Sequence, residues 1–201
     1  MFLLKRFSFS VIFVSVFLTA CGGGSSSSDD SNNVRATSIA TLGDSIGAGA
    51  CGTRPWGIRL GDELGVPVTN NSRNSRTTAI GLGLVDGLLA GKPSHLVVLL
   101  GTNDARQFIA PSTAISNMTA IVQKARAAGV VPIIGTVPAI LTSNSQNANA
   151  AQISSGYQNI EGAVVADIRS ALGTNAGFFC DGLHPNTAGQ SVIVSTFLGK
   201  F

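Results

Sequence analysis

The sequence predicts an α/β domain in which helices cover both faces of a parallel β-sheet. Four short runs rich in valine, isoleucine and leucine recur along the chain, and each ends in glycine, asparagine or threonine: 37–43, 66–70, 96–101 and 130–136. Apolar runs of this length are typical of strands buried on both faces. The segments between them carry helical periodicity, and alternating strands and helices build right-handed βαβ units.

The composition excludes several classes of protein. Of the 201 residues, 44% are apolar and only 11% are charged, whereas an ordinary soluble domain has about 25% charged residues. The one long apolar run, 7–18, is shorter than the roughly 18 to 20 residues of a spanning helix, so a multi-pass membrane protein is excluded. The net charge of +3 is not gathered into a basic block, so no nucleic-acid partner is expected.

The N-terminus is expected to be an export signal with a lipid-attachment cysteine. Lys5 and Arg6, the apolar run 7–18 and the small residues after it reproduce the three zones of a secretory signal. Residues 1–20 are therefore expected to be removed. The residues at the cut, Leu-Thr-Ala-Cys, resemble the lipobox of bacterial lipoproteins, which implies diacylation of Cys21. A plain signal with an incidental cysteine is the alternative.

A tether and one domain follow the signal. Residues 21–33, CGGGSSSSDDSNN, contain no aliphatic or aromatic side chain and are typical of a flexible linker. The remaining residues, 34–201, are expected to be one domain by length. The chain is thus expected to be an exported lipoprotein, periplasmic or at the cell surface, whose only membrane contact is the lipid on Cys21.

Helices are expected between and after the strands. Apolar residues at helical spacing predict helices over 56–64 and 115–125. After the fourth strand, the apolar positions of 153–168 keep one face over five turns, and 192–198 closes the chain on a last helix. A fifth strand is expected around 176–180.

Two glycine motifs overlap after the first strand. Residues 43–47, G-D-S-I-G, match the nucleophile elbow of α/β-hydrolases, but an elbow serine lies well inside a larger sheet, and Ser45 ends the first strand. Residues 47–52 match the G-x-G-x-x-G of dinucleotide-binding folds, but no helix opens there and the second strand ends in Asn70 where an acidic residue is expected. A dinucleotide-dependent oxidoreductase is therefore the least favoured class. The histidines and cysteines are too scattered for a zinc site, so no metal is expected.

Residues that bear chemistry follow the strands. They lie at Ser45, 72–77, 101–104 and 181–185. Because the carboxyl ends of parallel strands meet at one edge, where ligands bind, these four segments are expected to converge. His95 instead enters the third strand at the opposite edge, so a structural role is expected for it.

Three of these segments resemble the motifs of the SGNH, or GDSL, hydrolase family. G-D-S at 43–45, G-T-N-D at 101–104 and D-G-L-H-P at 181–185 match its first, third and last blocks in order and spacing. The second block, 70–77, departs from the family's N-x-S-x-x-G-x-T because Ser75 stands where glycine is usual. The resemblance implies a three-layer α/β/α sandwich with a flavodoxin-like parallel sheet of four to five strands.

The resemblance also implies a role for each site residue. Ser45 would attack the acyl carbonyl, His184 would act as base and then as acid, and Asp181 would orient the histidine. The Asn103 amide and the backbone N–H groups of Ser45 and Ser75 would form the oxyanion hole. Serine keeps the N–H that the usual glycine donates, although a positive φ at Ser75 would be costly. Local alternatives are a helix cap at Asp181 and an Asx-turn at Asn103.

The two cysteines of the domain are expected to pair. If the triad assembles, the loops that carry Cys51 and Cys180 are neighbours in an exported protein, where disulfides persist. The bond would fix the loop of Asp181 and His184 beside the nucleophile. Two buried free thiols are the alternative.

The expected function is hydrolysis of carboxylic esters by a lipid-anchored monomer that needs no cofactor. Lipid, short-chain and acetylated-glycan esters all remain open as substrates. The segment 141–151, rich in asparagine and serine, is the expected substrate-contacting loop. A polysaccharide O-deacetylase is the alternative within the enzyme class. A tethered binding protein with a degraded site, suggested by Ser75, is the alternative outside it.

Overall fold

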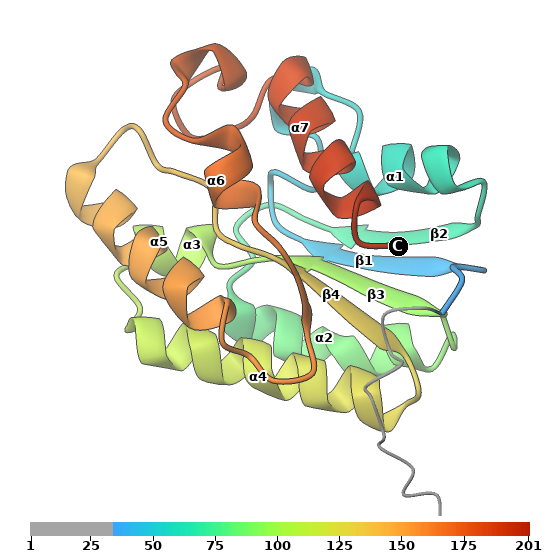
Figure 1. The fold of residues 1–201 in the computed structure, drawn as a ribbon. Coiled ribbons are helices and arrows are strands. Elements are labelled where there is room, and N and C mark those ends of the chain that lie inside the picture. The colour runs from blue at the N-terminus through green and yellow to red at the C-terminus, as the bar shows by residue number, and fades with distance from the viewer. Residues whose placement is uncertain (1–33) are drawn as a thin grey trace, which may run out of the picture.

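A parallel sheet forms the middle of three layers (Figure 1). The computed structural model describes residues 34–201. Its strands run in the order β2-β1-β3-β4-β5: β1 (Ile39–Gly43), β2 (Val68–Ser72), β3 (His95–Leu99), β4 (Val131–Gly135) and β5 (Val164–Ala166). This order is flavodoxin-like and confirms the predicted α/β sandwich. The expected signal 1–20, linker 21–33 and lipidation site Cys21 lie outside the described residues.

Helices cover both faces of the sheet, as Figure 1 shows for α1 and α7 above it and α2 and α4 below it. The first face carries α1 (Trp56–Leu64), α6 (Ile168–Leu172) and α7 (Thr187–Leu198). The second carries α2 (Thr78–Leu89), α3 (Thr102–Arg106), α4 (Pro111–Ala127) and α5 (Asn144–Tyr157). Within residues 34–201, no helix combines the length and the apolarity that crossing a bilayer requires.

Both faces of the strands are buried in separate apolar cores. Leu42 and Val98 pack with the helices of the second face, whereas Ile39 and Val97 pack with those of the first. Side chains alternate between the faces of a strand, so a strand covered on both sides must be apolar at successive positions. This burial explains why the sequence shows unbroken apolar runs here.

The predicted helix over 153–168 and the predicted strand over 176–180 are wrong. Helix α5 ends at Tyr157, and a turn in which Gly162 takes a φ of 76° leads into β5. Strand β5 has only three residues, too few to show a period of two, and the next apolar residue, Ile168, opens α6. Residues Ala176–Phe178 form the 3-10 helix η3 and do not join the sheet.

The predicted loop over 141–151 is mostly helical. Ser143 caps α5 by accepting a hydrogen bond from the Gln146 N–H, so the helix begins at Asn144. The asparagine and serine content is typical of a loop, but burial of Ala150 and Ile153 against the core holds the segment in a helix. Only 141–143 remains as connection, which corrects the expected length of the substrate-contacting loop.

The strand register brings the candidate site together. Gly43 at the end of β1 lies opposite Ser72 of β2 and Leu99 of β3, so the chain leaves all three strands at one level. The turn after β1 passes so close to β2 that a Cβ on Gly47 would collide with the Ser72 side chain. Glycine therefore allows the Ser45 turn to pack against the neighbouring loop.

Candidate active site

Ser45 lies on a tight turn that other elements hold rigidly. The Asp44 carboxylate accepts the Ile46 N–H at 2.9 Å, and the Asp44 carbonyl accepts the Ala48 N–H at 2.9 Å. From α7, the Gln190 side chain donates to the Ile46 carbonyl at 2.9 Å. The Ser45 side chain is thus half-buried at the carboxyl end of β1, on a turn held by its own hydrogen bonds and by α7.

Ser45, His184 and Asp181 form one continuous hydrogen-bonded chain. Ser45 Oγ lies 3.1 Å from His184 Nε2, and His184 Nδ1 lies 2.7 Å from Asp181 Oδ2. A proton on Nδ1 is donated to the carboxylate, which leaves Nε2 as an acceptor for the serine hydroxyl. The residues come from opposite ends of the sequence, and the structure brings them together at the edge predicted for the site.

The Asp181 carboxylate is held as an anion. Partial burial raises its pKa, but hydrogen bonds from the His184 ring and from the His184 and Leu183 N–H groups outweigh burial and lower the pKa to about 2. The two backbone bonds to Oδ1 measure 2.7 Å and 3.0 Å. The carboxylate therefore stays charged at any pH near neutrality, beside a His184 side chain that is 20% exposed.

The loop of Asp181 and His184 is tied to the rest of the domain at several points. A disulfide joins Cys180 to Cys51, which follows the Ser45 turn, across 129 residues of sequence. The Cys180 N–H donates to the His184 carbonyl at 2.9 Å, and the Leu141 N–H donates to the Gly182 carbonyl at 2.8 Å. The loop is thus fixed on one side by the disulfide and on the other by the segment after β4.

Asn103 and Ser75 face the same edge from two further loops. Asn103 lies in the first turn of α3, is 4% exposed, and donates from Nδ2 to the Arg76 carbonyl at 3.0 Å. An amide has two N–H groups, so one remains for a ligand. Ser75 takes a φ of 63°, the left-handed conformation that explains why glycine is usual at this position.

Asp44 is more deeply buried than the sequence suggests, and its pKa is shifted. The G-D-S motif alone is typical of a turn residue, yet the side chain is 1% exposed next to the nucleophile. Burial raises the pKa of Asp44 from 3.8 to about 6, while the Ile46 N–H and the nearby His184 pull it back down. Its neighbours include His184 and Thr102 of α3, which are distant in sequence, so the local sequence does not reveal this environment.

Other residues considered from the sequence lie outside this arrangement. His95 begins β3 at the opposite edge, is 2% exposed, and has its Nδ1 3.0 Å from Ser94 Oγ. Burial lowers the pKa of its ring, and a structural role fits this position. Residues 47–52 form turns and the 3-10 helix η2 (Ala50–Gly52), and α1 opens only at Trp56, so the glycine motif does not cradle a helix N-terminus.

One group in residues 34–201 has the residue types of a metal site. Cys51, Asp181 and His184 offer ligand atoms within 4.8 Å of one another. The Cys51 sulfur is engaged in the disulfide, and the other two side chains bond each other beside Ser45. These contacts assign the group to the serine-centred arrangement.

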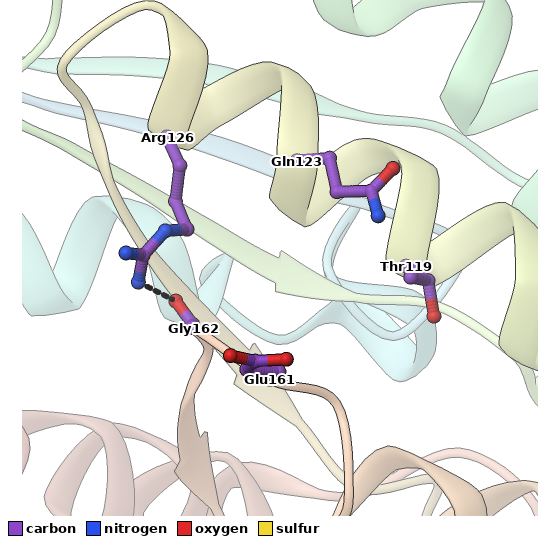
Figure 2. A pocket seen from close by; sticks show the side chains of 5 residues that line it. All are labelled: Thr119, Gln123, Arg126, Glu161 and Gly162. Atoms are coloured by element: carbon purple, nitrogen blue, oxygen red, sulfur yellow. Dashed lines mark hydrogen bonds between the residues drawn. The ribbon is translucent and has the colours of Figure 1, made fainter.

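A hollow of about 390 Å³ lies away from this edge (Figure 2). It is lined from α4 by Thr119, Gln123 and Arg126, and from the connection before β5 by Glu161 and Gly162. Figure 2 shows Arg126 reaching the Gly162 carbonyl, at 3.3 Å. Gly162 precedes the amino end of β5, so this hollow is not part of the Ser45 site.

Comparison with known proteins decides the family. A model of the GDSL-like lipase/acylhydrolase family matches residues 41–192, which include all the residues of the hydrogen-bonded chain. The protein belongs to this family. Membership confirms the SGNH/GDSL resemblance and an ester-bond hydrolase, and it contradicts the dinucleotide-dependent alternative.

Individual proteins that are similar to this chain agree with the family assignment. Esterase TesA of Pseudomonas aeruginosa is 31% identical over 172 residues, which cover 77% of this chain and 83% of that protein. A crystal structure of TesA has a TM-score of 0.72 at 26% identity and covers 82% of this chain and 97% of its own. A G-D-S-L family protein from Desulfitobacterium hafniense shares the fold, with a TM-score of 0.72, 21% identity and coverage of 82% and 99%.

Proposed function

We propose that this GDSL-family hydrolase cleaves carboxylic esters with Ser45 as nucleophile, His184 as acid and base, and Asp181 as the group that orients the histidine. The observation that carries the proposal is the unbroken path from Ser45 Oγ through the His184 ring to Asp181, with links of 3.1 Å and 2.7 Å. These distances are within the reach that proton transfer between catalytic groups requires.

The first half-reaction forms an acyl-enzyme. Ser45 Oγ bonds to the acyl carbon while its proton passes to His184 Nε2, and the carbonyl oxygen becomes an oxyanion. When that intermediate collapses, the bond from carbon to the leaving oxygen breaks. The proton on Nε2 then passes to the leaving alcohol, and the ionised Asp181 stabilises the imidazolium that exists in between.

The second half-reaction returns the enzyme to its starting state. Water attacks the acyl carbon as His184 Nε2 takes one of its protons, and collapse of the second oxyanion breaks the bond to Ser45 Oγ. The proton on Nε2 returns to Ser45, and a carboxylic acid leaves. Every proton is carried by groups of this chain and by water, so the cycle balances without a cofactor.

Three donors are proposed for the oxyanion: the backbone N–H groups of Ser45 and Ser75 and the second N–H of the Asn103 amide. The Arg76 carbonyl holds the first N–H of that amide, and this contact fixes the plane of the amide. Loss of one oxyanion donor typically raises the barrier by about 3 to 4 kcal/mol. The left-handed Ser75 supplies the N–H that glycine usually supplies in the family.

Lipid esters, short-chain esters and acetyl groups on glycans are the proposed substrates. Esterase TesA supports a simple ester. The acetylxylan esterase Axe2 of Geobacillus stearothermophilus shares the fold, with a TM-score of 0.68 at 19% identity over 82% of this chain and 93% of its own. The O-deacetylase alternative is therefore kept among the substrates to be tested.

A lipid anchor on Cys21 remains part of the proposal. The Thr37 N–H binds Ser94 Oγ at 3.0 Å, which ties the segment before β1 to the amino edge of the sheet. Ser45 lies at the carboxyl edge, so the segment before β1 and the site are at opposite edges of the domain. Metabolic labelling with an alkynyl fatty acid tests the anchor: label is expected on the wild-type protein and not on Cys21→Ser, and an unlabelled wild type contradicts it.

Hydrolysis assays test the proposed function. Purified wild-type protein, Ser45→Ala and His184→Ala are compared on p-nitrophenyl acetate, p-nitrophenyl decanoate and acetylated xylan, with Ser191→Ala on α7 as a matched serine control. The wild type and Ser191→Ala are expected to hydrolyse at least one ester, and the two site variants to lose at least about 1,000-fold in kcat. An inactive wild type supports a binding protein, whereas full activity of Ser45→Ala overturns the proposed nucleophile.

A further inference from the structure

Arg76 directly follows Ser75 and closes the turn that carries it. Its guanidinium reaches back five residues to Asn71 on β2, where Nη1 donates to the backbone carbonyl and Nη2 donates to the side-chain oxygen at 2.8 Å. The two bonds form a bidentate clamp across the base of the turn. Ser75, with its φ of 63°, lies inside the closed ring.

The backbone of Arg76 also contacts Asn103 of α3, which carries another proposed oxyanion donor. Its carbonyl accepts Asn103 Nδ2 at 3.0 Å, a buried hydrogen bond. Next to it, the Asp104 carboxylate accepts the Thr78 N–H at 2.9 Å and its hydroxyl at 2.6 Å, which docks the start of α2 on α3. Arg76 therefore connects the Ser75 turn to Asn103 of α3, and these two segments carry donors that must point at one oxygen.

Burial of the charged Arg76 side chain costs desolvation free energy. Arg76 is 7% exposed, and within residues 34–201 its guanidinium donates to two oxygens of Asn71, the backbone carbonyl and the side-chain amide, and not to a carboxylate. Burial and then the nearby Arg73 lower the pKa of the guanidinium. An apolar side chain of similar length would avoid the desolvation of a charge, so stability alone does not account for arginine at this position.

We propose that Arg76 is a positioning residue of the oxyanion hole, whose clamp on Asn71 keeps Ser75 in its left-handed conformation and so aims the Ser75 N–H alongside the Asn103 amide. This inference rests on the proposed function. Arginine offers a rigid fork that can hold both Asn71 oxygens at once, whereas a lysine offers a point charge on a flexible stem. The clamp thus compensates for the departure from glycine at residue 75.

The clamp and the serine should depend on each other. Glycine adopts a positive φ about as readily as a negative one, whereas serine pays a conformational cost there. Without the clamp, Ser75 is expected to relax out of the left-handed region and turn its N–H away. With glycine at residue 75, loss of the clamp should lower kcat less, because glycine adopts the left-handed conformation without the clamp.

The test uses the single variants Arg76→Met, Arg76→Lys and Ser75→Gly and the double variants Ser75→Gly/Arg76→Met and Ser75→Gly/Arg76→Lys. For each, kcat and KM are measured on p-nitrophenyl acetate well below the unfolding midpoint of the variant. Arg76→Met is expected to lower kcat about 10- to 100-fold with KM within about twofold of the wild type. The kcat of Arg76→Lys is expected to lie between those of the wild type and Arg76→Met. In the Ser75→Gly background, the loss of kcat on Arg76→Met is expected to be at least about threefold smaller.

Arg59→Met is the matched control, because the Arg59 guanidinium, on α1, donates to Ser191 of α7 at 2.8 Å. The kcat of this variant is expected to stay unchanged. A folded Arg76→Met with wild-type kcat, or an equal loss in both backgrounds, overturns the proposal. If Arg76→Met does not fold, Arg76→Lys in the two backgrounds decides by the same comparison. An inactive wild type or an active Ser45→Ala would instead refute the proposed function, so the two failures are distinguishable.

Discussion

Asp181 holds His184 at two points: its Oδ2 lies 2.7 Å from the ring Nδ1, and its Oδ1 accepts the backbone N–H of the same histidine at 2.7 Å. One carboxylate thus fixes both the ring and the main chain that carries it. The three-residue spacing makes this possible within a single loop. The Asp181 carboxylate can therefore select the His184 tautomer that leaves Nε2 to accept the Ser45 proton.

Replacement of Asp181 by asparagine should disturb that tautomer. The amide can donate to Nδ1, which moves the ring proton to Nε2 and leaves no acceptor for Ser45. Asp181→Asn is expected to lower kcat about 1,000- to 10,000-fold on p-nitrophenyl acetate. Asp62→Asn, at an exposed ion pair with Arg54, makes the same change in net charge and serves as control. A loss in Asp181→Asn no larger than in this control contradicts the orienting role.

The proposed contribution of Ser75 is its backbone, and side-chain substitutions should show it. Ser75→Ala and Ser75→Gly keep the N–H and are expected to retain kcat within about threefold. Ser75→Val is expected to destabilise the fold by roughly 1 to 3 kcal/mol in thermal unfolding, because a β-branched residue resists a φ of 63°. A loss of kcat above about tenfold in Ser75→Ala would assign the donor role to the hydroxyl.

Asp44 should make stability depend on pH. Its pKa in the folded protein is about 6, above its ordinary 3.8, so the folded state binds the proton more tightly than the unfolded state. The unfolding free energy should then fall as pH rises from about 4 to about 6, by up to roughly 3 kcal/mol for this buried group. Asp44→Asn cannot ionise and should be the more stable protein above pH 6 and no more stable below pH 4.

Denaturant unfolding at pH 3.5, 5, 6 and 7.5 measures this difference. Asp86→Asn on the exposed side of α2, where Lys124 binds the carboxylate at 2.8 Å, provides the control for loss of one charge. A stability difference between wild type and Asp44→Asn that is constant over this pH range rules out the assigned ionisation.

The Cys51–Cys180 bond should support both stability and catalysis. It closes 129 residues of sequence, and in the chain-entropy model loss of such a cross-link costs about 5 kcal/mol. The Cys51→Ala/Cys180→Ala variant is expected to unfold at lower temperature and to have reduced kcat, because the Asp181 loop loses one anchor. Thiol titration of the unreduced domain checks the bond itself, and two reactive thiols per chain would contradict it.

The strands that the sequence predicts well are those whose whole length is buried. Strands β1, β3 and β4 lie within two residues of the predicted runs, since burial on both faces forces continuous apolar residues. Strand β2 is displaced by two residues because its sequence, VTNNS, is polar at the edge of the sheet. Helix α2 shows no helical stripe, because TAIGLGLVDGLL is apolar nearly all round and interrupted by three glycines.

The candidate site was predictable where it depends on strand ends. Ser45 and Asn103 follow β1 and β3, and a parallel sheet collects such segments at one edge. His184 follows the 3-10 helix η3 and no strand, so it was predictable from its D-G-L-H-P motif and not from a strand end. The role of Arg76 was not predictable, because it arises from contacts with Asn71 and Asn103 that exist only after folding. The burial of Asp44 likewise depends on packing from distant elements.

The identity of the nucleophile is tested most directly by trapping it. The purified protein is inactivated with a fluorophosphonate, digested, and mapped by mass spectrometry, with Ser45→Ala and His184→Ala treated in parallel. One phosphonyl group is expected on the peptide that contains Ser45, none on Ser45→Ala, and labelling of His184→Ala slowed at least about 100-fold. A phosphonyl group on another residue of the wild-type protein, or equal labelling of Ser45→Ala, would contradict the serine-centred mechanism.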